Sequence, residues 1–296
     1  MGRVRMEIVY HIGANGTDED RLLKSLLRNV DVLAADGVKV PGPSNYRRLI
    51  RETIQGLDGA PPPQDARSIL LDAILDDEPT ERLVLSNSNF ICIPNRIFDK
   101  GVFYMLTEPK IRGLLDLFPG DEIELCIALR NPATFIPENF SKSKFDDLTT
   151  FMRGMQPDEV RWSDVIKRIR HVAPNCKLTV WCNEDTPLIW GRLMREIAGI
   201  PDTVPLVGTH DLLATIMEPE GMQRLRGYLK NNPPPTPQHE LKIILAFLKK
   251  YALDDAMDED IDLPEFTQEL IEQLTDDYDA DVDYIQTIPG VTFIQP

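Results

Sequence analysis

Residues 6–27, MEIVYHIGANGTDEDRLLKSLL, contain an apolar run, a turn with two glycines and then apolar residues at helical spacing. The pattern predicts a buried strand at Met6–His11 and a helix over Asp18–Ala35, with Gly37 and Pro41 closing the unit. A strand that leads through a glycine-containing turn into a helix is the arrangement that holds a phosphate in many nucleotide enzymes.

The rest of the first two thirds of the chain repeats this alternation. Strand-like apolar runs occur at residues 82–86, 122–130 and 177–182, and helical segments lie between them. Strands that alternate with helices predict an α/β fold with a parallel sheet covered by helices on both faces. We expect a single domain of residues 1–296, in which residues from about 211 to 296 form a helical C-terminal layer. The segment NNPPPTP at 231–237 is either a linker or a rigid turn between packed helices.

The charge of the chain is concentrated near its C-terminus. The formal net charge is −16, and 42% of the residues are hydrophobic, which is ample for a sizeable core. Residues 254–283 contain 14 Asp and Glu and no Lys or Arg, so the rest of the chain carries only −2. Without a basic stripe to offset phosphate charge, nucleic-acid binding is not expected.

The composition also indicates a cellular location. No apolar run reaches the roughly 18 residues of a membrane span, and the N-terminal segment is too charged for a signal peptide. The four cysteines form no CxxC pair, and two of them fall in apolar strand-like runs, which favours reduced thiols. We therefore expect a soluble cytoplasmic protein with no membrane partner; the oligomeric state is left open.

Topology alone predicts where a ligand would bind. In an open α/β sheet, ligands bind outside the carboxyl ends of the strands. Four stretches follow the carboxyl ends of the predicted strands: HIGANGT (11–17), SNSNF (86–90), RNPATF (130–135) and CNEDTP (182–187). We expect these stretches to form a crevice for a small molecule.

The first of these stretches is the candidate cofactor loop. Its residues Gly13, Ala14, Asn15, Gly16 and Thr17 offer backbone N–H groups just before a helix, which is the usual combination for binding an anion. The full P-loop spacing is not met. The alternative is that the glycines only shape the turn and that the three acids after Thr17 complement the helix dipole.

Three further side chains at this edge could carry chemistry. Arg130 could hold a phosphate through its planar guanidinium, or it could pair with a nearby carboxylate. His11 could act as a general base, or it could be a hydrogen-bonded core histidine. Glu184 could position a substrate amine or hydroxyl, or it could cap the helix that comes next in the chain.

A metal site is not expected. Asp258, Asp260, Asp262 and Glu269 match four ligand positions of an EF-hand loop, but Leu263 replaces the obligatory glycine. The four histidines are too scattered for a metal cluster or a Ser-His-Asp triad.

The acidic C-terminal segment also predicts a docked helix. Leu263, Phe266, Leu270, Leu274 and Tyr278 recur at helical spacing, so one side of this helix can pack on the core. The acids would then face solvent.

Taken in order along most of the chain, these stretches resemble bacterial sulfotransferase-like proteins. VYHIGANGTDEDRLLKSL, with GVKVPG after it, is similar to the phosphosulfate-binding loop of that family, its helix and the next turn. RLVLSNSNF is similar to its second strand, and LCIALRNPATF to the strand whose arginine binds the 3′-phosphate of the nucleotide. LTVWCNEDTPLIW and IPGVTFIQP also fit. The resemblance implies a P-loop, sulfotransferase-like fold and the cofactor 3′-phosphoadenosine 5′-phosphosulfate.

The loop departs from the family pattern at its functional positions. Gly16 stands in place of the lysine, Glu19 and Asp20 in place of the threonine pair, Ser88 in place of an acid and Glu138 in place of a serine. Since the cofactor is strongly anionic, these changes predict a degenerate donor site.

Two functions remain open. In the first, the protein is a transferase that moves a sulfonate to an unknown acceptor, with Gly13–Thr17 cradling the donor, Arg130 holding its distal phosphate, and Glu184 or His11 as the base. In the second, it is a non-catalytic ligand-binding or interaction protein that has kept the fold and lost donor binding.

Overall fold

The computed structural model describes residues 5–75, 79–253 and 263–296. In these residues six parallel strands form one sheet in the order β2-β3-β1-β4-β5-β6. The α/β class with a parallel sheet is thus confirmed. The strands are β1 (Glu7–His11), β2 (Val38–Lys39), β3 (Arg82–Ser86), β4 (Glu122–Leu129), β5 (Lys177–Cys182) and β6 (Val291–Ile294).

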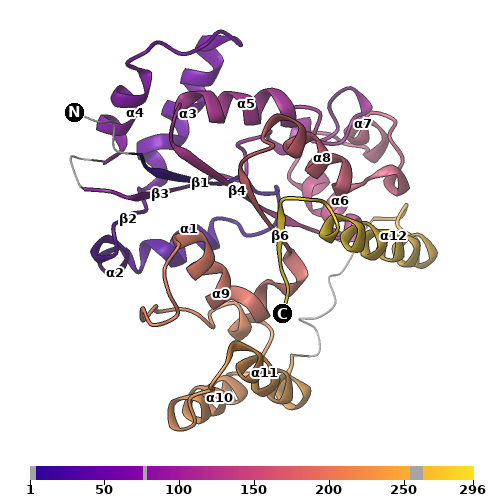
Figure 1. The fold of residues 1–296 in the computed structure, drawn as a ribbon. Coiled ribbons are helices and arrows are strands. Elements are labelled where there is room, and N and C mark those ends of the chain that lie inside the picture. The colour runs from indigo at the N-terminus through magenta and orange to yellow at the C-terminus, as the bar shows by residue number, and fades with distance from the viewer. Residues whose placement is uncertain (1–4, 76–78, 254–262) are drawn as a thin grey trace.

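Helices cover both faces of the sheet, as expected (Figure 1). The central strands are apolar on both sides: Ile8 and Tyr10 of β1 join one core cluster, whereas Val9 joins the other. One face packs against α1 (Arg21–Leu27), α2 (Val30–Ala35) and α9 (Thr186–Ala198). The other packs against α3 (Pro43–Leu57), α4 (Ala66–Leu75), α5 (Thr107–Leu117), α6 (Pro132–Ser141), α7 (Leu148–Met152), α8 (Trp162–Val172) and α12 (Gln268–Gln286).

The single helix predicted over residues 18–35 is wrong in detail, because the structure divides it into α1 and α2. The break falls at the buried residue Asn29. Its amide donates to the Ser25 and Val207 carbonyls at 2.8 and 3.1 Å, and its Oδ1 accepts from the Val207 N–H at 2.8 Å. The Asn29 side chain thereby binds the backbone of Val207, which is distant in sequence. The helix is interrupted at the residue that makes this contact.

The two edge strands were not predicted. β2 has only two residues, and β6 lies in the region where the sequence pattern indicated helices. Each is too short for its apolar periodicity to be read from the sequence, and each gains order from pairing with a longer neighbour.

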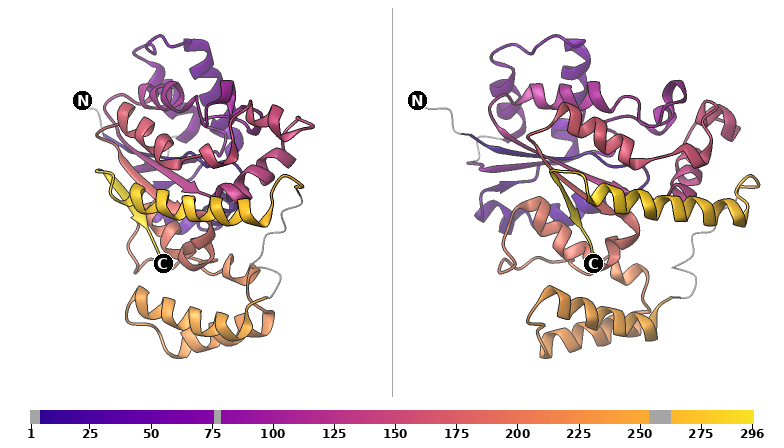
Figure 2. Two further views of the ribbon diagram at one scale, coloured as in Figure 1. Left: turned by 90° about the vertical axis from the view of Figure 1, so that its right-hand side faces the viewer. Right: turned by 45° about the vertical axis from the view of Figure 1, so that its right-hand side comes forward.

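The described helices of the C-terminal region form two separate parts (Figure 2). The first is a hairpin of α10 (Pro219–Asn231) and α11 (Pro237–Tyr251), which has a small apolar cluster of its own. The rings of Tyr228 and Phe247 pack across the hairpin at a centroid distance of 6.0 Å. The segment NNPPPTP is therefore a turn between packed helices, which was one of the two alternatives.

The second part is α12, which docks on the core as predicted. Leu274 and Tyr278 of α12, and Phe266 just before its start, are buried in the same cluster as α8. One acid does not face solvent as expected, because Asp281 is buried and its carboxylate accepts a hydrogen bond from the Ser163 N–H at 3.0 Å. Asp281 thus supplies α8 with an N-terminal partner from another helix.

No described helix has both the length and the apolar character needed to cross a membrane. All four cysteines are free thiols.

Candidate functional site

The candidate site lies at the carboxyl edge of the sheet, between the loops after β1 and β4, where the crevice was predicted. These two strands are neighbours, but α1 packs on one face of the sheet and α6 on the other. Adjacent loops that diverge in this way create the usual ligand crevice of an open α/β sheet.

The first half of the candidate cofactor loop continues the ladder with β4 and does not form an open cradle. The Ala14 N–H donates to the Ala128 carbonyl at 3.2 Å, and the Gly13 carbonyl accepts from the Ala128 N–H at 2.8 Å. The Asn15 N–H donates to the hydroxyl of Tyr104 at 3.0 Å. Two amides that could have bound a phosphate are thus used inside the protein.

Asn15 is a structural residue of this loop. It is buried, and its side-chain amide donates to Asn89 Oδ1 at 2.8 Å and to the Cys92 carbonyl at 3.0 Å. Its Oδ1 accepts from Tyr104 Oη at 2.6 Å. Asn15 therefore joins the loop after β1 to the loop after β3, and its polar groups are occupied by protein.

The second half of the loop packs against α6. Gly16 has a φ of +67°, which favours glycine, and a Cβ at this position would lie 3.0 Å from both Asn139 Nδ2 and Glu138 Cγ. The Thr17 hydroxyl turns back to donate to the Ala14 carbonyl at 2.8 Å. The loop is a compact turn with protein close on its outer side.

The carboxylate of Asp18 occupies the start of α1. Its two oxygens accept from the N–H groups of Asp20 at 3.3 Å and Leu22 at 3.1 Å. These are the kind of unpaired helix donors that bind phosphate in nucleotide enzymes. The Asp18 carboxylate therefore occupies the position at which the sequence predicted that a phosphate of the cofactor would bind.

The other two acids are engaged by basic residues. Arg47 of α3 grips Asp20 through two nitrogens, at 2.5 and 2.9 Å, and donates to the Ser86 carbonyl at 2.9 Å. The hydrogen bond from Arg47 lowers the pKa of Asp20. Lys142 contacts Glu19 at 2.6 Å, and the pKa of Glu19 is lowered as well. These contacts fix the loop and partly neutralise it.

Arg130 lies at the crevice but faces the loop backbone. Its guanidinium donates to the Gly16 carbonyl, and its Nε donates to the Thr134 hydroxyl at 3.1 Å. The residue is buried, and its own carbonyl accepts from Trp162 Nε1 at 2.8 Å. β4 ends one residue before Arg130, and α6 begins at Pro132, so the stretch expected as a loop is largely the first turn of a helix.

His11 is almost completely buried at the end of β1. Its Nδ1 lies 2.9 Å from the Ser86 hydroxyl, and its ring stacks on Trp181 at a centroid distance of 5.7 Å. Burial lowers the pKa of His11, and the carboxylates of Asp18 and Asp20 oppose this effect only in part. Within the described residues Nε2 has no hydrogen-bond partner. Burial therefore favours the neutral form of His11, and its Nε2 is enclosed within the protein.

Glu184 binds protein groups at the far side of the crevice. Its Oε1 accepts from the Asn131 N–H at 2.7 Å, and its Oε2 accepts from the Tyr278 hydroxyl at 3.1 Å. Desolvation by the surrounding protein raises the pKa of Glu184, although the residue is exposed on one side. Glu184 thereby connects the start of α6 to α12 and does not cap α9.

Sequence reasoning missed the residues that close this site. Arg47, Tyr104 and Asn139 come from three different helices or loops, and each contacts the loop after β1 or its acids. No sequence motif marks them, because their positions relative to the loop depend on how α3, α5 and α6 pack.

Metal binding finds no support in the described part of the chain. No group of three or more His, Cys, Asp or Glu residues is placed there to hold an ion. Asp258, Asp260 and Asp262 of the EF-hand comparison lie outside the described residues, and Glu269 belongs to the first turn of α12.

Comparison with known proteins gives a similarity of structure. No protein-family model matches the sequence, and no curated protein matches it. Among solved structures, a sulfotransferase from Alicyclobacillus acidocaldarius is similar over 80% of this chain and 95% of that chain. The sequence identity is 13% and the TM-score is 0.35, and we draw no conclusion about activity from a similarity of this size.

Proposed function

We propose that this chain is a sulfotransferase-like protein that has lost donor binding and acts as a non-catalytic ligand-binding or interaction protein. The sequence resemblance, which runs in order along most of the chain, supports the relationship. The observation that carries the loss of donor binding is the position of the Asp18 carboxylate, which accepts the helix N–H groups that an anion would need.

Electrostatics supports the same conclusion. A phosphosulfate group placed at the start of α1 would approach the Asp18 carboxylate, whereas Arg47 and Lys142 are engaged by the neighbouring acids. Two unit charges ~4 Å apart repel by about 4 kcal/mol at an effective dielectric of 20. That repulsion corresponds to roughly a thousandfold loss of affinity.

The second candidate is transfer of a sulfonate from 3′-phosphoadenosine 5′-phosphosulfate. The buried Arg130 at the crevice and the neutral His11 imidazole favour it. In this scheme Arg130 would hold the 3′-phosphate, and His11 or Glu184 would take the acceptor proton. Donor binding would first require Arg130 to leave the Gly16 carbonyl and Asp18 to leave the start of α1.

A thermal-shift assay with 3′-phosphoadenosine 5′-phosphate separates the two functions. A ligand at 100 times its Kd stabilises a protein by about 2.7 kcal/mol, which is about 4 °C for a chain of this length. We expect no shift for the native protein at millimolar nucleotide and a measurable shift for Asp18→Asn, which removes the charge. A clear shift of the native protein that is lost in Arg130→Ala would instead establish a working donor site.

We also propose a cytoplasmic, bacterial protein. The absence of disulfides among four cysteines supports a reducing compartment.

A further inference from the structure

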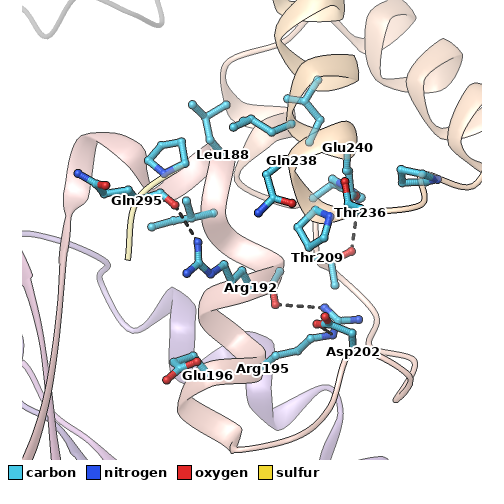
Figure 3. Close-up of a pocket in the computed structure, with 18 of the residues that line it drawn as sticks. Leu188, Arg192, Arg195, Glu196, Asp202, Thr209, Thr236, Gln238, Glu240 and Gln295 are labelled. Carbon is cyan, nitrogen blue, oxygen red and sulfur yellow. Dashed lines mark hydrogen bonds and ion pairs between the residues drawn. The ribbon is translucent and has the colours of Figure 1, made fainter. Parts of the chain in front are cut away.

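A groove of about 800 Å³ runs along the outer face of α9, away from the crevice at the carboxyl edge of the sheet (Figure 3). The first turns of α11 and residues 209–210 form its opposite wall. Arg82 and Lys177, the first residues of β3 and β5, lie at one end of it. That end is at the amino edge of the sheet, so this groove is distinct from the candidate donor site.

The groove exists because a glycine brings two segments close together. A Cβ at Gly191 of α9 would lie 3.0 Å from the Thr209 Cβ, so a larger residue would push residue 209 away from the helix. Leu188, Arg192 and Arg195 recur on the same side of α9 at spacings of three or four residues. One face of a single helix thus presents an apolar side chain and two guanidinium groups to the groove.

Arg195 has a buried donor without a partner. Its two terminal nitrogens donate to the carbonyls of Gly191 at 3.1 Å and Val204 at 3.3 Å, but its Nε is buried and unpaired. The nearest carboxylate, that of Asp202, is 3.7 Å from Nε, too far for a hydrogen bond, and its side chain is 85% exposed. A buried charged donor in this state indicates that an acceptor is missing.

Arg192 has spare donors as well. One nitrogen donates to the Gln295 carbonyl at 2.9 Å (Figure 3), and no carboxylate of the described chain lies within ion-pair distance of its guanidinium. A guanidinium has five N–H donors, so most of those on Arg192 remain for a ligand. By contrast, other basic groups of the groove already contact carboxylates: Lys177 contacts Glu124 and Glu196, and His210 contacts Glu240.

The other walls of the groove combine apolar and polar side chains. Leu188 and Ile244 line it from α9 and α11, and Pro234, Pro235 and Pro237 lie along the turn before α11. Glu196, Asp202 and Glu240 also line it. Its volume is within the 300–1,000 Å³ that is typical of small-molecule sites.

We propose that this groove binds a small organic carboxylate with an apolar body. The carboxylate would accept from Arg192, because the planar guanidinium matches a carboxylate in two-point contact. It would accept from Arg195 Nε as well once that side chain turns toward the groove. The apolar body would lie against Leu188 and Ile244. This site does not depend on whether the donor loop is active.

The test uses phenylacetate as the probe, measured by calorimetry and by amide NMR shifts of the full chain. Phenylacetamide has the same shape without the charge, and acetate has the charge without the apolar body. We expect saturable binding of phenylacetate that shifts the Gly191 and Thr209 amides, and much weaker binding of both controls. Absence of saturable binding at millimolar phenylacetate, or equal binding of phenylacetamide, would overturn the proposal.

Two variants locate the contact. Arg192→Gln should weaken phenylacetate binding by at least about tenfold, which is the value of a hydrogen bond to a charged group. Arg192 is exposed, so this variant should stay folded, and Arg192→Lys should lose part of the affinity because it keeps the charge but not the fork. Arg226→Gln, on the exposed side of α10, is the matched control and should bind normally. An equal loss in Arg192→Gln and Arg226→Gln would show a non-specific charge effect and refute the site.

Discussion

Replacing Gly16 with alanine tests whether the loop after β1 is a packed turn or an open cradle. At a φ of +67° an added Cβ would lie 3.0 Å from Asn139 Nδ2 and from Glu138 Cγ. The Glu138 side chain can move aside. Asn139 cannot move as freely, because it is fully buried and its amide donates to the Phe135 carbonyl at 2.9 Å.

The expected loss of stability has two parts. A left-handed conformation costs a residue other than glycine about 1–2 kcal/mol. Displacing the Asn139 amide weakens a buried hydrogen bond, which adds about 1 kcal/mol. The sum of about 2–3 kcal/mol corresponds to a fall in Tm of about 3–5 °C, since unfolding entropy is ~2.1 cal/mol/K per residue.

Gly59→Ala is the matched control. Gly59 has a φ of +83°, and nothing lies within 4 Å of a Cβ at that position. This variant should lose only the conformational part, about 1–2 kcal/mol. Urea unfolding of both variants measures the difference. If Gly16→Ala is no less stable than Gly59→Ala, the space beside Gly16 is open, and the reasoning that the loop is filled by protein is wrong.

Three further predictions concern Asp281, Asp20 and the acidic C-terminal segment. Asp281→Ala should lower the free energy of unfolding by about 1–2 kcal/mol because it removes the partner of the first turn of α8, whereas Asp283→Ala, on the exposed side of α12, should have little effect. Asp20→Asn should lower Tm at pH 7. Arg47 lowers the pKa of Asp20, so the pair stabilises the fold above the unfolded pKa of ~3.9, and the difference from the native protein should vanish as the pH falls through the lower folded pKa. Added sodium chloride should raise Tm by screening the acidic C-terminal segment, and calcium at matched ionic strength should act alike; a rise specific to micromolar calcium would contradict this.

The sequence predicts that the candidate residues meet at one edge of the sheet, but it does not predict which groups their side chains contact. His11, Arg130 and Glu184 lie at or just beyond the ends of apolar strands, and the carboxyl ends of parallel strands meet at one edge of the sheet. The same pattern does not show that Arg130 turns to the Gly16 carbonyl or that Glu184 turns to Tyr278. Those directions depend on side chains that meet only when α6 and α12 are packed.

The sequence by itself determined the α/β class, the buried strands and the docked face of α12, because continuous apolar runs and helical spacings are local properties of the chain. It also determined that three acids, Asp18, Glu19 and Asp20, directly follow the glycine-containing turn after β1. Only the tertiary structure decided what these acids do: Asp18 binds the start of α1, and Asp20 binds Arg47. Only the tertiary structure, too, created the groove along α9, because its walls come from segments that are distant in sequence. Local patterns record burial and turns, whereas the partner of a polar group depends on packing between elements.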